Sequence, residues 1–270
     1  MTDRYGVIGH PINHSKSPVI HGQFATQTSQ DISYEAFDIA PEDLSSAIIK
    51  LVGEGIKGLN VTVPLKNEVK ELVDELSDRA LLAGAVNTIE VQEDGTLAGD
   101  NTDGVGLIRD LRDNLGIGLE DTEVLILGAG GATRGIIPAL LESGTARILI
   151  ANRTLEKATD LATQFANLGQ ISACRFDELG SQHFDLIINA TSAGLQGGMP
   201  PFPATIISPD TVVYDLSYAM TDTPFTIWAR EHGAEQVHQG WGMLVEQAAE
   251  SFFIWRGVRP KTRPVRTRLP

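Results

Sequence analysis

The stretch VLILGAGGATRG, residues 124–135, decides the fold of the second half of the chain. Its leading apolar residues predict a strand that is buried on both faces. Gly128 permits a tight turn after this strand, and Gly130 lets the backbone approach a pyrophosphate. The small residues that follow let a helix pack on the strand, and the N-terminus of that helix favours negative charge. The stretch therefore predicts a dinucleotide-binding loop formed by Gly128, Ala129, Gly130, Gly131 and Ala132.

Strands and helices alternate after this loop. Apolar runs at 146–153, 184–191 and 211–218 predict further buried strands. Segments with a helical pattern occupy 131–144 and 155–169. This alternation predicts a doubly wound parallel sheet, and we expect it to form a domain over residues 104–240.

The end of the second strand of this sheet selects the cofactor. An Asp or Glu at this position would bind the ribose 2′-hydroxyl of NAD. The chain instead has Asn152, Arg153 and Thr154 there, and Lys157 follows in the next helix. An arginine beside small hydroxyl and amide groups suits the 2′-phosphate of NADP, which an aspartate would repel. The sequence therefore favours NADP over NAD.

The first 103 residues carry a second α/β pattern. The pattern predicts strands at 5–11, 33–40 and 56–64, helices at 17–28, 41–55 and 65–76, and a hairpin within 87–101 that turns at Asp94-Gly95. We therefore expect residues 1–103 to form a compact α/β unit. A last amphipathic stretch at 244–257 predicts a helix, and its periodicity does not decide which unit it packs on.

The segment NVTVPLKNEV, residues 60–69, presents a single lysine in an unusual way. A short strand is stopped by Pro64, and Lys66 follows two residues later. A lysine that is only exposed to solvent does not need to be held in place by such a turn. A hydride-transfer enzyme needs a proton donor, because the cofactor supplies only the hydride. Lys66 is therefore a candidate acid or base.

Other polar side chains also lie at the ends of predicted elements in the first half. Ser15 and Ser17 flank Lys16 beside the start of a helix, where hydroxyls and the helix dipole favour a carboxylate. Taken singly, each polar residue can be a helix cap or a turn residue. In an open α/β fold, however, the strand carboxyl ends line one crevice. The candidate set is Ser15, Ser17, Asn60, Thr62, Lys66, Asn87 and Asp103.

Composition limits the class of protein. A chain of 270 residues with 42% hydrophobic content is large enough for two packed domains. A net charge of −14 disfavours a nucleic-acid partner, and the single cysteine, Cys174, excludes an intramolecular disulfide. We see no signal peptide and no apolar run that could cross a bilayer, so we expect a cytoplasmic protein without a membrane partner. No metal site is predicted.

Eight motifs follow one another along the chain: GHPINHSKSPVIH, NVTVPLK, AGAVNT, GDNTDGVG, LGAGGATRG, NRT, NATSAG and GWGMLVEQAAESFFIWRG. From residue 5 to about residue 258 they resemble the shikimate dehydrogenase family, in its NADP-dependent, bacterial biosynthetic type. The resemblance implies an N-terminal α/β substrate domain, a Rossmann-type doubly wound parallel sheet, and a C-terminal helix that returns to the first domain. The implied domains are 1–103 with 241–270, and 104–240.

The resemblance also implies an activity and a set of site residues. The family reduces 3-dehydroshikimate reversibly to shikimate with NADPH, in the biosynthesis of chorismate and the aromatic amino acids. The implied catalytic acid–base pair is Lys66 and Asp103. The implied substrate-binding residues are Ser15, Ser17, Asn60, Thr62, Asn87, Tyr218 and Gln247. The implied cofactor-binding residues are Asp78, Gly128, Ala129, Gly130, Gly131, Ala132, Asn152, Arg153, Thr154, Lys157, Ala190, Thr191, Leu216, Gly240 and Met243.

The chain departs from the family pattern at two positions. Lys157 stands where family members often have arginine, and a lysine offers a point charge rather than a flat bidentate fork. NADP should still be preferred, by a smaller margin. Leu216 stands where related chains often have methionine, which changes the volume little.

Other functions remain open at this point. The chain could be a quinate/shikimate dehydrogenase that prefers NAD, or a non-catalytic protein that binds shikimate or NADPH. A methylene-tetrahydrofolate dehydrogenase would share the two-domain plan, but it would lack the SKS and NTDG motifs that this chain has. We expect a monomer or a homodimer that acts on a small-molecule substrate.

Overall fold

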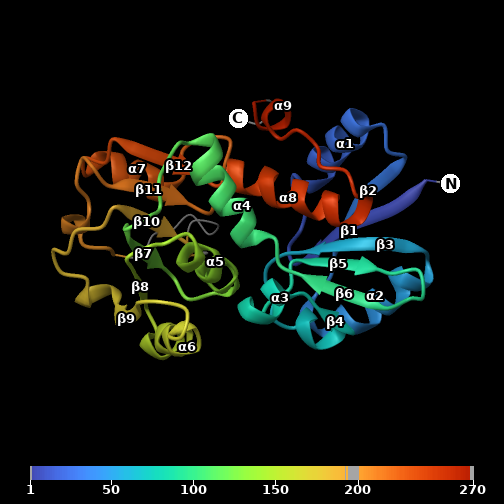
Figure 1. Ribbon diagram of the computed structural model, residues 1–270, viewed down its shortest axis with the longest axis horizontal. Coiled ribbons are helices and arrows are strands. Elements are labelled where there is room, and N and C mark those ends of the chain that lie inside the picture. Colours follow the sequence, from blue (N-terminus) through green and yellow to red (C-terminus); the bar gives the residue numbers. More distant parts are fainter. Residues whose placement is uncertain (1, 192, 194–200, 268–270) are drawn as a thin grey trace. The chain divides into compact units, whose positions relative to one another are not determined.

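This computed structural model describes residues 2–191, 193 and 201–267, within which the chain divides into two units (Figure 1). Unit 1 comprises the chain up to Leu107 and the chain from Leu244 onward. Unit 2 runs from Ile108 to Met243. The chain therefore passes from the first unit to the second and back once.

Unit 2 is built, in its described part, on a sheet of six parallel strands (Figure 1). The strands are β7 (Glu123–Leu127), β8 (Arg147–Asn152), β9 (Ile171–Arg175), β10 (Leu186–Asn189), β11 (Val212–Asp215) and β12 (Gln236–Gln239). They lie in the order β9-β8-β7-β10-β11-β12. Successive strands of the chain are therefore added first on one side of β7 and then, from β10 onward, on its other side. This is the strand order of doubly wound dinucleotide-binding folds, which bind ligands at that change of side. The predicted parallel sheet is confirmed.

The helices of unit 2 are α5 (Gly131–Glu142), α6 (Leu155–Phe165) and α7 (Pro224–Glu231), with a π-helical segment at Asp110–Asn114 and 3₁₀ turns at Phe176–Glu178 and Ala204–Ile206. The sequence of β7 explains why the sheet needs helices. Its residues from Val124 to Leu127 are all fully buried, so both faces of this strand must be covered. Leu125 and Leu127 belong to a core that also contains Phe184 and Phe202.

Unit 1 contains a mixed sheet in the order β2-β1-β3-β5-β6-β4. The strands are β1 (Asp3–Gly9), β2 (Ile32–Asp38), β3 (Ile56–Val61), β4 (Glu75–Leu76), β5 (Thr88–Val91) and β6 (Leu97–Asp100). Strands β2, β1 and β3 are parallel, whereas β5 runs antiparallel to both β3 and β6. The predicted hairpin is β5–β6, and Gly95 takes a φ of +92° in its turn, where a side chain would be strained.

The described helices that lie wholly or mostly in unit 1 are α1 (Ser17–Thr28), α2 (Leu44–Gly53), α3 (Asp78–Ala83), α4 (Asp103–Arg109), α8 (Trp241–Arg256) and α9 (Arg263–Arg266), with 3₁₀ turns at Pro41–Asp43 and Val69–Leu72. Helix α2 shows why these segments are helical: Leu44, Ile48 and Leu51 recur on one face and are all buried. In the part of the chain described, no helix is both long enough and apolar enough to span a membrane.

Helix α8 starts in unit 2 and continues into unit 1, as the resemblance implied. Its Trp255 stacks on Tyr5 with ring centroids 4.8 Å apart and donates from Nε1 to the Ile89 carbonyl at 3.0 Å. A Cβ on Gly58 would lie 2.5 Å from that indole nitrogen, so only glycine fits beneath the ring. Phe252 of the same helix shares a core cluster with Phe24 of α1. The last long helix therefore packs on the first unit.

The segment after β3 differs from the sequence prediction of a helix over 65–76. Leu65 and Val69 are buried at helical spacing, which is the pattern that suggested a helix. The chain instead makes tight turns, in which the N–H of Glu68 donates to the Leu65 carbonyl. Further on, the N–H of Asp74 donates to the Leu97 carbonyl, and β4 joins the edge of the sheet. Backbone pairing with β6 thus satisfies groups that a helix would have paired internally.

Candidate active site

Lys66 and Asp103, the two residues singled out from the sequence as an acid–base pair, are in contact. Lys66 Nζ lies 2.5 Å from Asp103 Oδ2, and the two side chains are 14% and 5% exposed. A hydrogen bond between charged groups that are shielded from water is a strong one. An ammonium held in this way can donate a proton to a substrate oxygen and recover it in the reverse reaction.

Local structure fixes both members of the pair. Lys66 lies in the turn after β3, where Leu65 is fully buried and the Lys66 carbonyl accepts the N–H of Val86 at 2.9 Å. Asp103 begins α4, and its N–H donates to Asn101 Oδ1 at 3.1 Å. Because both backbones are anchored, pairing the side chains costs rotamer entropy but no further backbone entropy.

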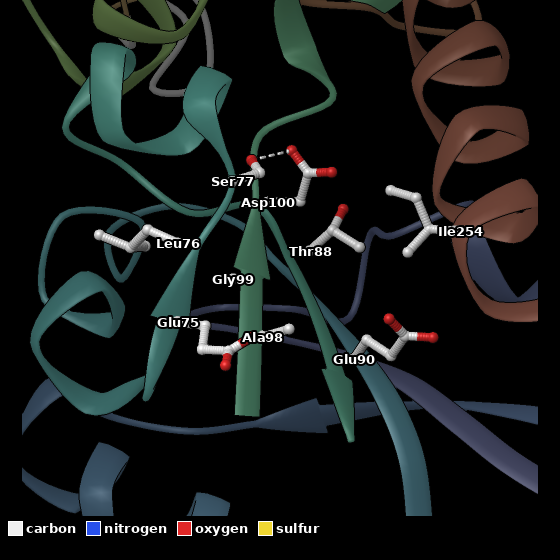
Figure 2. Close-up of a pocket in the computed structure, with 9 residues that line it drawn as sticks. All are labelled: Glu75, Leu76, Ser77, Thr88, Glu90, Ala98, Gly99, Asp100 and Ile254. Carbon is white, nitrogen blue, oxygen red and sulfur yellow. Dashed lines mark hydrogen bonds between the residues drawn. The ribbon is translucent and has the colours of Figure 1, made fainter. Parts of the chain in front are cut away.

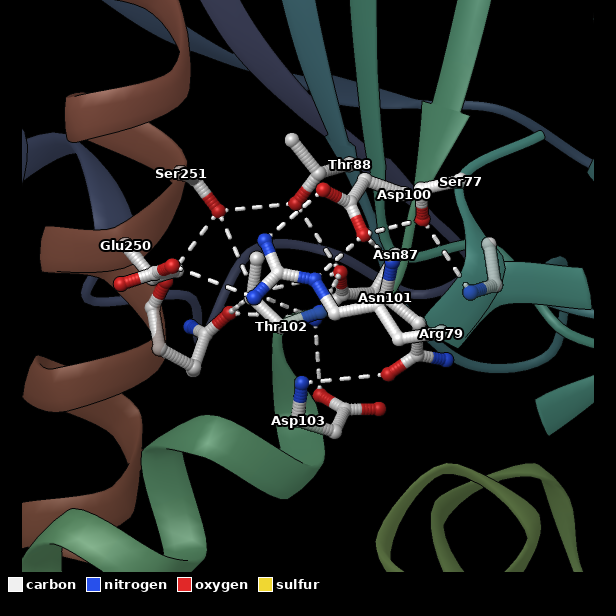
Figure 3. Close-up of polar contacts among 12 residues, drawn as sticks. Ser77, Arg79, Asn87, Thr88, Asp100, Asn101, Thr102, Asp103, Glu250 and Ser251 are labelled. Carbon is white, nitrogen blue, oxygen red and sulfur yellow. Dashed lines mark hydrogen bonds and ion pairs between the residues drawn. The ribbon is translucent and has the colours of Figure 1, made fainter. Parts of the chain in front are cut away.

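Asn87 and Gln247 complete the surroundings of Asp103. Asn87 Nδ2 donates to Asp103 Oδ1 at 2.9 Å and to Thr102 Oγ1 at 3.0 Å (Figure 3). Gln247 of α8 accepts hydrogen bonds from Asn87 Nδ2 and from Thr102 Oγ1, each at 3.3 Å. The structure therefore gathers Lys66, Asn87, Asp103 and Gln247 into one cluster within unit 1.

Asn60 has its polar atoms engaged inside the protein. Its Oδ1 accepts the Tyr34 hydroxyl at 2.8 Å, and its Nδ2 donates to Ser251 Oγ at 2.9 Å and to Thr88 Oγ1 at 3.2 Å. Burial raises the pKa of Tyr34 well above its ordinary value, against an opposing hydrogen bond from Ser17, so Tyr34 remains a neutral donor. These contacts favour a positioning role for Asn60 over direct contact with substrate hydroxyls.

Ser15 and Ser17 lie at the start of α1. Ser17 is the first helical residue, and Lys16, whose side chain cannot accept a hydrogen bond, occupies the N-cap position. The N–H of Ser17 donates to Ser15 Oγ at 3.3 Å. This helix end, with its hydroxyls and without an acid in its first turn, suits a carboxylate. Thr62 follows β3, half-buried, with its methyl group against Gly9.

An ionic network in unit 1 was missed from the sequence. Arg79 binds Asp100 through Nε at 2.6 Å and Nη2 at 2.8 Å, and it binds Glu250 through Nη1 at 3.1 Å (Figure 3). Arg259 also pairs with Glu250, and the Ser77 hydroxyl donates to Asp100 at 2.6 Å. The network links α3, β6 and α8. No sequence signal identifies it, because charged residues of these types are usually solvated.

A pocket of about 260 Å³ lies on the sheet of unit 1 beside Ile254 of α8 (Figure 2). Glu75, Glu90 and Asp100 are among the residues that line it. Burial, with a smaller contribution from the charge of Asp100, raises the pKa of Glu90. Three carboxyl groups around one pocket oppose an anionic ligand. We therefore do not assign a carboxylate-bearing substrate to this pocket.

The predicted glycine loop in unit 2 joins β7 to α5. Gly128 takes a φ of +105°, and its N–H donates to the Ala151 carbonyl at 2.8 Å. A Cβ added to Gly130 would meet no atom of the described residues within 4 Å, so their packing does not require this glycine. The free space lies at the N-terminus of a helix whose first turn contains no acid. A pyrophosphate fits such a cradle.

Cationic side chains follow the neighbouring strand β8. Arg153 and Lys157 are both exposed, and Thr154 is the N-cap of α6. Asn152 Nδ2 donates to the Thr154 carbonyl at 2.8 Å, which holds the turn. Within the described ranges of the chain, neither cation pairs with a carboxylate. Both are therefore available to a phosphate, as NADP requires.

The remaining predicted cofactor residues of unit 2 follow other strands of the same sheet. Ala190 and Thr191 follow β10, Leu216 follows β11, Gly240 follows β12, and Met243 is buried in the first turn of α8. Since the carboxyl ends of parallel strands share one edge of a sheet, the residues after these strands lie along the edge that carries the glycine loop. A Cβ on Gly240 would lie 2.4 Å from the Leu216 carbonyl oxygen, which explains the glycine.

Two predicted site residues lie in a different unit from the other residues that were predicted to bind the same ligand. Tyr218, predicted to bind substrate, lies in unit 2 and packs against Trp241 with ring centroids 4.5 Å apart. Burial raises the pKa of Tyr218. Asp78, predicted to bind the cofactor, lies in unit 1, where it is exposed at the start of α3.

Three family models match the chain. The shikimate dehydrogenase substrate binding domain matches residues 7–89. The shikimate / quinate 5-dehydrogenase model matches residues 111–196, and the shikimate 5′-dehydrogenase C-terminal domain matches residues 240–269.

Individual proteins are similar over nearly the whole chain. The shikimate dehydrogenase (NADP(+)) of Methylococcus capsulatus is 53% identical over 263 residues, which cover 97% of this chain and 94% of that protein. A crystallised enzyme from Pseudomonas putida is 43% identical, covers 99% of this chain and 98% of its own, and has a TM-score of 0.91. Shikimate 5-dehydrogenase from Thermus thermophilus, solved with NADP(H) and shikimate, is 34% identical over 98% of each chain with a TM-score of 0.88. These matches confirm the resemblance inferred from the motifs.

Proposed function

Because this chain belongs to the shikimate dehydrogenase family, we propose that it catalyses the reversible reduction of 3-dehydroshikimate to shikimate with NADPH. It is an oxidoreductase that acts on a CH–OH group, in the biosynthesis of aromatic amino acids. The observation that carries this function is the buried pair of Lys66 and Asp103, whose ammonium and carboxylate meet beside Asn87.

The chemistry requires a hydride and a proton on a carbonyl group. NADPH, when bound, supplies the hydride from its nicotinamide to the C3 carbonyl of the substrate. Lys66 gives the proton to the oxygen at C3, and in the oxidation direction it takes the proton from the C3 hydroxyl. Asp103 orients the ammonium through Oδ2, while Asn87 holds its Oδ1. Acid–base catalysis by a positioned group contributes typically ~10²–10⁴-fold.

Residues of unit 1 bind the rest of the substrate in this proposal. Ser15 and Ser17 bind its carboxylate, which the uncapped start of α1 supports. Thr62, Asn87 and Gln247 bind ring hydroxyls. Asn60 acts indirectly, as its hydrogen bonds to buried groups suggest. Tyr218 contributes from unit 2.

Residues of unit 2 hold NADP. The loop Gly128–Ala132 binds the pyrophosphate, and the 2′-phosphate lies between Arg153 and Lys157, with Asn152 and Thr154 supplying neutral polar groups. These roles are supported by the free space at Gly130 and by the exposure of the two cations, which pair with no carboxylate in the described part of the chain. The nicotinamide end is bound by residues after β10, β11 and β12, which are Ala190, Thr191, Leu216, Gly240 and Met243. Asp78 is a further candidate from unit 1.

The alternative functions are not favoured. A preference for NAD would need an acid at the end of β8, where the chain has Asn152, Arg153 and Thr154. A non-catalytic binding protein would be expected to have lost Lys66 or Asp103, and both are present and paired. Quinate remains the side substrate to test, since one matching family model covers both acids.

We propose that the enzyme acts on free small molecules in the cytoplasm, as a monomer or a homodimer. A net charge of −14 supports the absence of a nucleic-acid partner, because an acidic surface repels a phosphate backbone.

The first experiment measures NADPH oxidation with 3-dehydroshikimate, followed by kcat/KM for shikimate and quinate with NADP and with NAD. We expect turnover with 3-dehydroshikimate and a preference for shikimate and NADP. Lys66→Ala should lower kcat by about 10²–10⁴-fold with little change in substrate affinity, because it removes the proton donor and leaves the carboxylate and hydroxyl ligands.

The matched control is Lys70→Ala, four positions further along the same segment, where the lysine pairs with the exposed Glu71 and with no other carboxylate among the described residues. This variant should keep the wild-type kcat. A Lys66→Ala enzyme with a near-normal kcat would refute the acid–base role. A folded wild type that binds both ligands without oxidising NADPH would refute the function itself.

A further inference from the structure

Asn87 is held by a closed ring of buried hydroxyl groups in unit 1. The Thr88 hydroxyl donates to Asn87 Oδ1 at 2.9 Å, and Asn87 Nδ2 donates to Thr102 Oγ1 at 3.0 Å. Ser251 closes the ring, because its Oγ lies 3.3 Å from Thr102 Oγ1 and 2.8 Å from Thr88 Oγ1 (Figure 3). All four side chains are at most 1% exposed, so water does not compete for these bonds.

The hydrogen bonds of the ring can all point the same way around it, each group donating to the next. Each hydroxyl has one proton to give. The bonds run in one sense around the ring when Thr102 donates to Ser251, Ser251 to Thr88, and Thr88 to Asn87 Oδ1. In this arrangement Thr102 and Ser251 leave their other acceptors unused, which are Gln247 Oε1 at 3.3 Å and the Gln247 carbonyl at 3.1 Å. The second proton of Asn87 Nδ2 then points out of the ring to Asp103 Oδ1 at 2.9 Å. Hydrogen bonds that run in one sense polarise one another, so the ring strengthens the donor that Asn87 presents to Asp103.

The opposite orientation of the Asn87 amide is excluded by its neighbours. A flipped amide would set its oxygen against the Asp103 carboxylate, and it would set its NH₂ against the N–H of Thr102, which now donates to Oδ1 at 2.8 Å. Two donors would then face each other and two acceptors would face each other. The ring and the Thr102 backbone therefore fix the amide nitrogen toward Asp103.

From this geometry we propose that Thr88, Thr102 and Ser251 are positioning residues that act on catalysis through Asn87 and Asp103. Thr88 is at the start of β5, Thr102 immediately precedes α4, and Ser251 is on α8. The last helix thus takes part in the active site through a buried hydroxyl that touches no reacting atom. The proposal rests on the function proposed above, in which Asp103 orients Lys66.

The test breaks the ring at two points. Thr88→Val and Ser251→Ala each remove one hydroxyl without adding a polar group. Each should lower kcat about tenfold, the equivalent of one hydrogen bond, with KM for NADPH unchanged. Because either break opens the same ring, the double variant should be at most about twofold slower than the slower single variant. Thr88→Ser, which keeps the hydroxyl, should recover kcat to within about twofold of wild type.

The matched control is Thr211→Val in unit 2. Thr211 is also fully buried, and its hydroxyl bonds to the Phe184 carbonyl at 3.1 Å, but it takes no part in the site. This variant should lose some thermal stability and keep its kcat. If Thr88→Val does not fold, Ser251→Ala and Thr102→Val make the same double-mutant test.

The failures of the two proposals are distinguishable. Losses that multiply to about a hundredfold in the double variant, or full kcat in both single variants, would overturn the ring. An inactive wild type would overturn the proposed function instead. In that case the exchange of the Asn87 side-chain amide protons with water still tests the ring by NMR. It should be about tenfold faster in Ser251→Ala than in wild type, and an unchanged rate would overturn the proposal.

Discussion

The glycine loop of unit 2 and the polar cluster around Asp103 in unit 1 are constructed in opposite ways. The loop uses consecutive residues, Gly128–Ala132, and it depends on backbone conformation and on missing side-chain volume. The cluster, whose catalytic role is our proposal, uses polar side chains of Lys66, Asn87, Asp103 and Gln247, which come from four separate segments. We therefore expect the loop to lose cofactor binding when side-chain atoms are added to it. The cluster should lose its function when polar atoms are removed from it.

The two sheets also differ in how far their strand order predicts the position of a site. The parallel sheet of unit 2 has a regular strand order, and that order alone predicts where a ligand would bind. The mixed sheet of unit 1 gathers its site through the turn after β3, the start of β5, the start of α4 and the returning helix α8. A regular topology predicts where its site is, whereas an irregular one requires the contacts to be known.

Gly130→Ala gives the largest expected effect among the tests of this comparison. Among the described residues the added Cβ meets no atom within 4 Å, and the backbone at Gly130 has a φ of −100°, which any residue adopts. Thermal stability should therefore be unchanged. The methyl group should enter the space assigned to the pyrophosphate and weaken NADPH binding by about tenfold to a hundredfold, as overpacking does. Calorimetric titration with NADPH measures it.

Gly118→Ala is the matched control for this change. Gly118 is likewise exposed, with no atom of the described chain within 4 Å of its Cβ position, and it lies ten residues before the start of the glycine loop. It should leave both stability and NADPH affinity as in wild type. An unchanged affinity in Gly130→Ala would place the pyrophosphate elsewhere.

His21→Phe tests how strongly unit 1 depends on buried polar side chains. Burial lowers the pKa of His21 to about 3, with a smaller opposing contribution from Asn60, and its ring stacks on Tyr34 at 4.1 Å. An unfolded histidine has a pKa of about 6.5, so between these values the unfolded chain binds more protons than the folded one. The stability contribution is therefore complete above about pH 6.5 and is lost as pH falls toward about 3.

Phenylalanine keeps the stacked ring and removes the titration. At about pH 5 the wild type should have lost ~2 kcal/mol through His21, and the variant should not show this loss. Urea unfolding of both proteins at about pH 7.5 and about pH 5 measures the difference, in which other titrating groups cancel. Equal losses in the two proteins would show that the folded state accommodates a charged His21.

Arg153→Ser gives the smallest expected effect. An exposed charge contact is worth about 1 kcal/mol, so kcat/KM with NADPH should fall about fivefold while kcat/KM with NADH stays the same. Arg147→Ser is the control, since Arg147 lies at the opposite end of the same strand β8. A parallel loss with both cofactors would mean that Arg153 supports the fold of the turn rather than the 2′-phosphate.

Several features of the fold could be predicted from local sequence. Buried apolar runs and a glycine loop predicted the parallel sheet of unit 2, and Asp94-Gly95 predicted the hairpin of unit 1. The helix predicted at 65–76 was wrong, because Leu65 and Val69 keep helical spacing in a chain that pairs with a sheet edge instead. Local periodicity reports which residues are buried, and it does not report which backbone partner is available.

By itself, the sequence determined the family, the α/β class, the glycine loop and the candidate pair Lys66 and Asp103, because each depends on residue types at short, fixed spacings. Only the tertiary structure decided that Asn60 bonds to buried groups, that Arg79 joins Asp100 to Glu250, and that Ser251 closes a ring around Asn87. The reason is physical. A buried hydrogen bond joins groups that are adjacent in space, and its partners can lie more than a hundred residues apart in the chain, as Thr88 and Ser251 do.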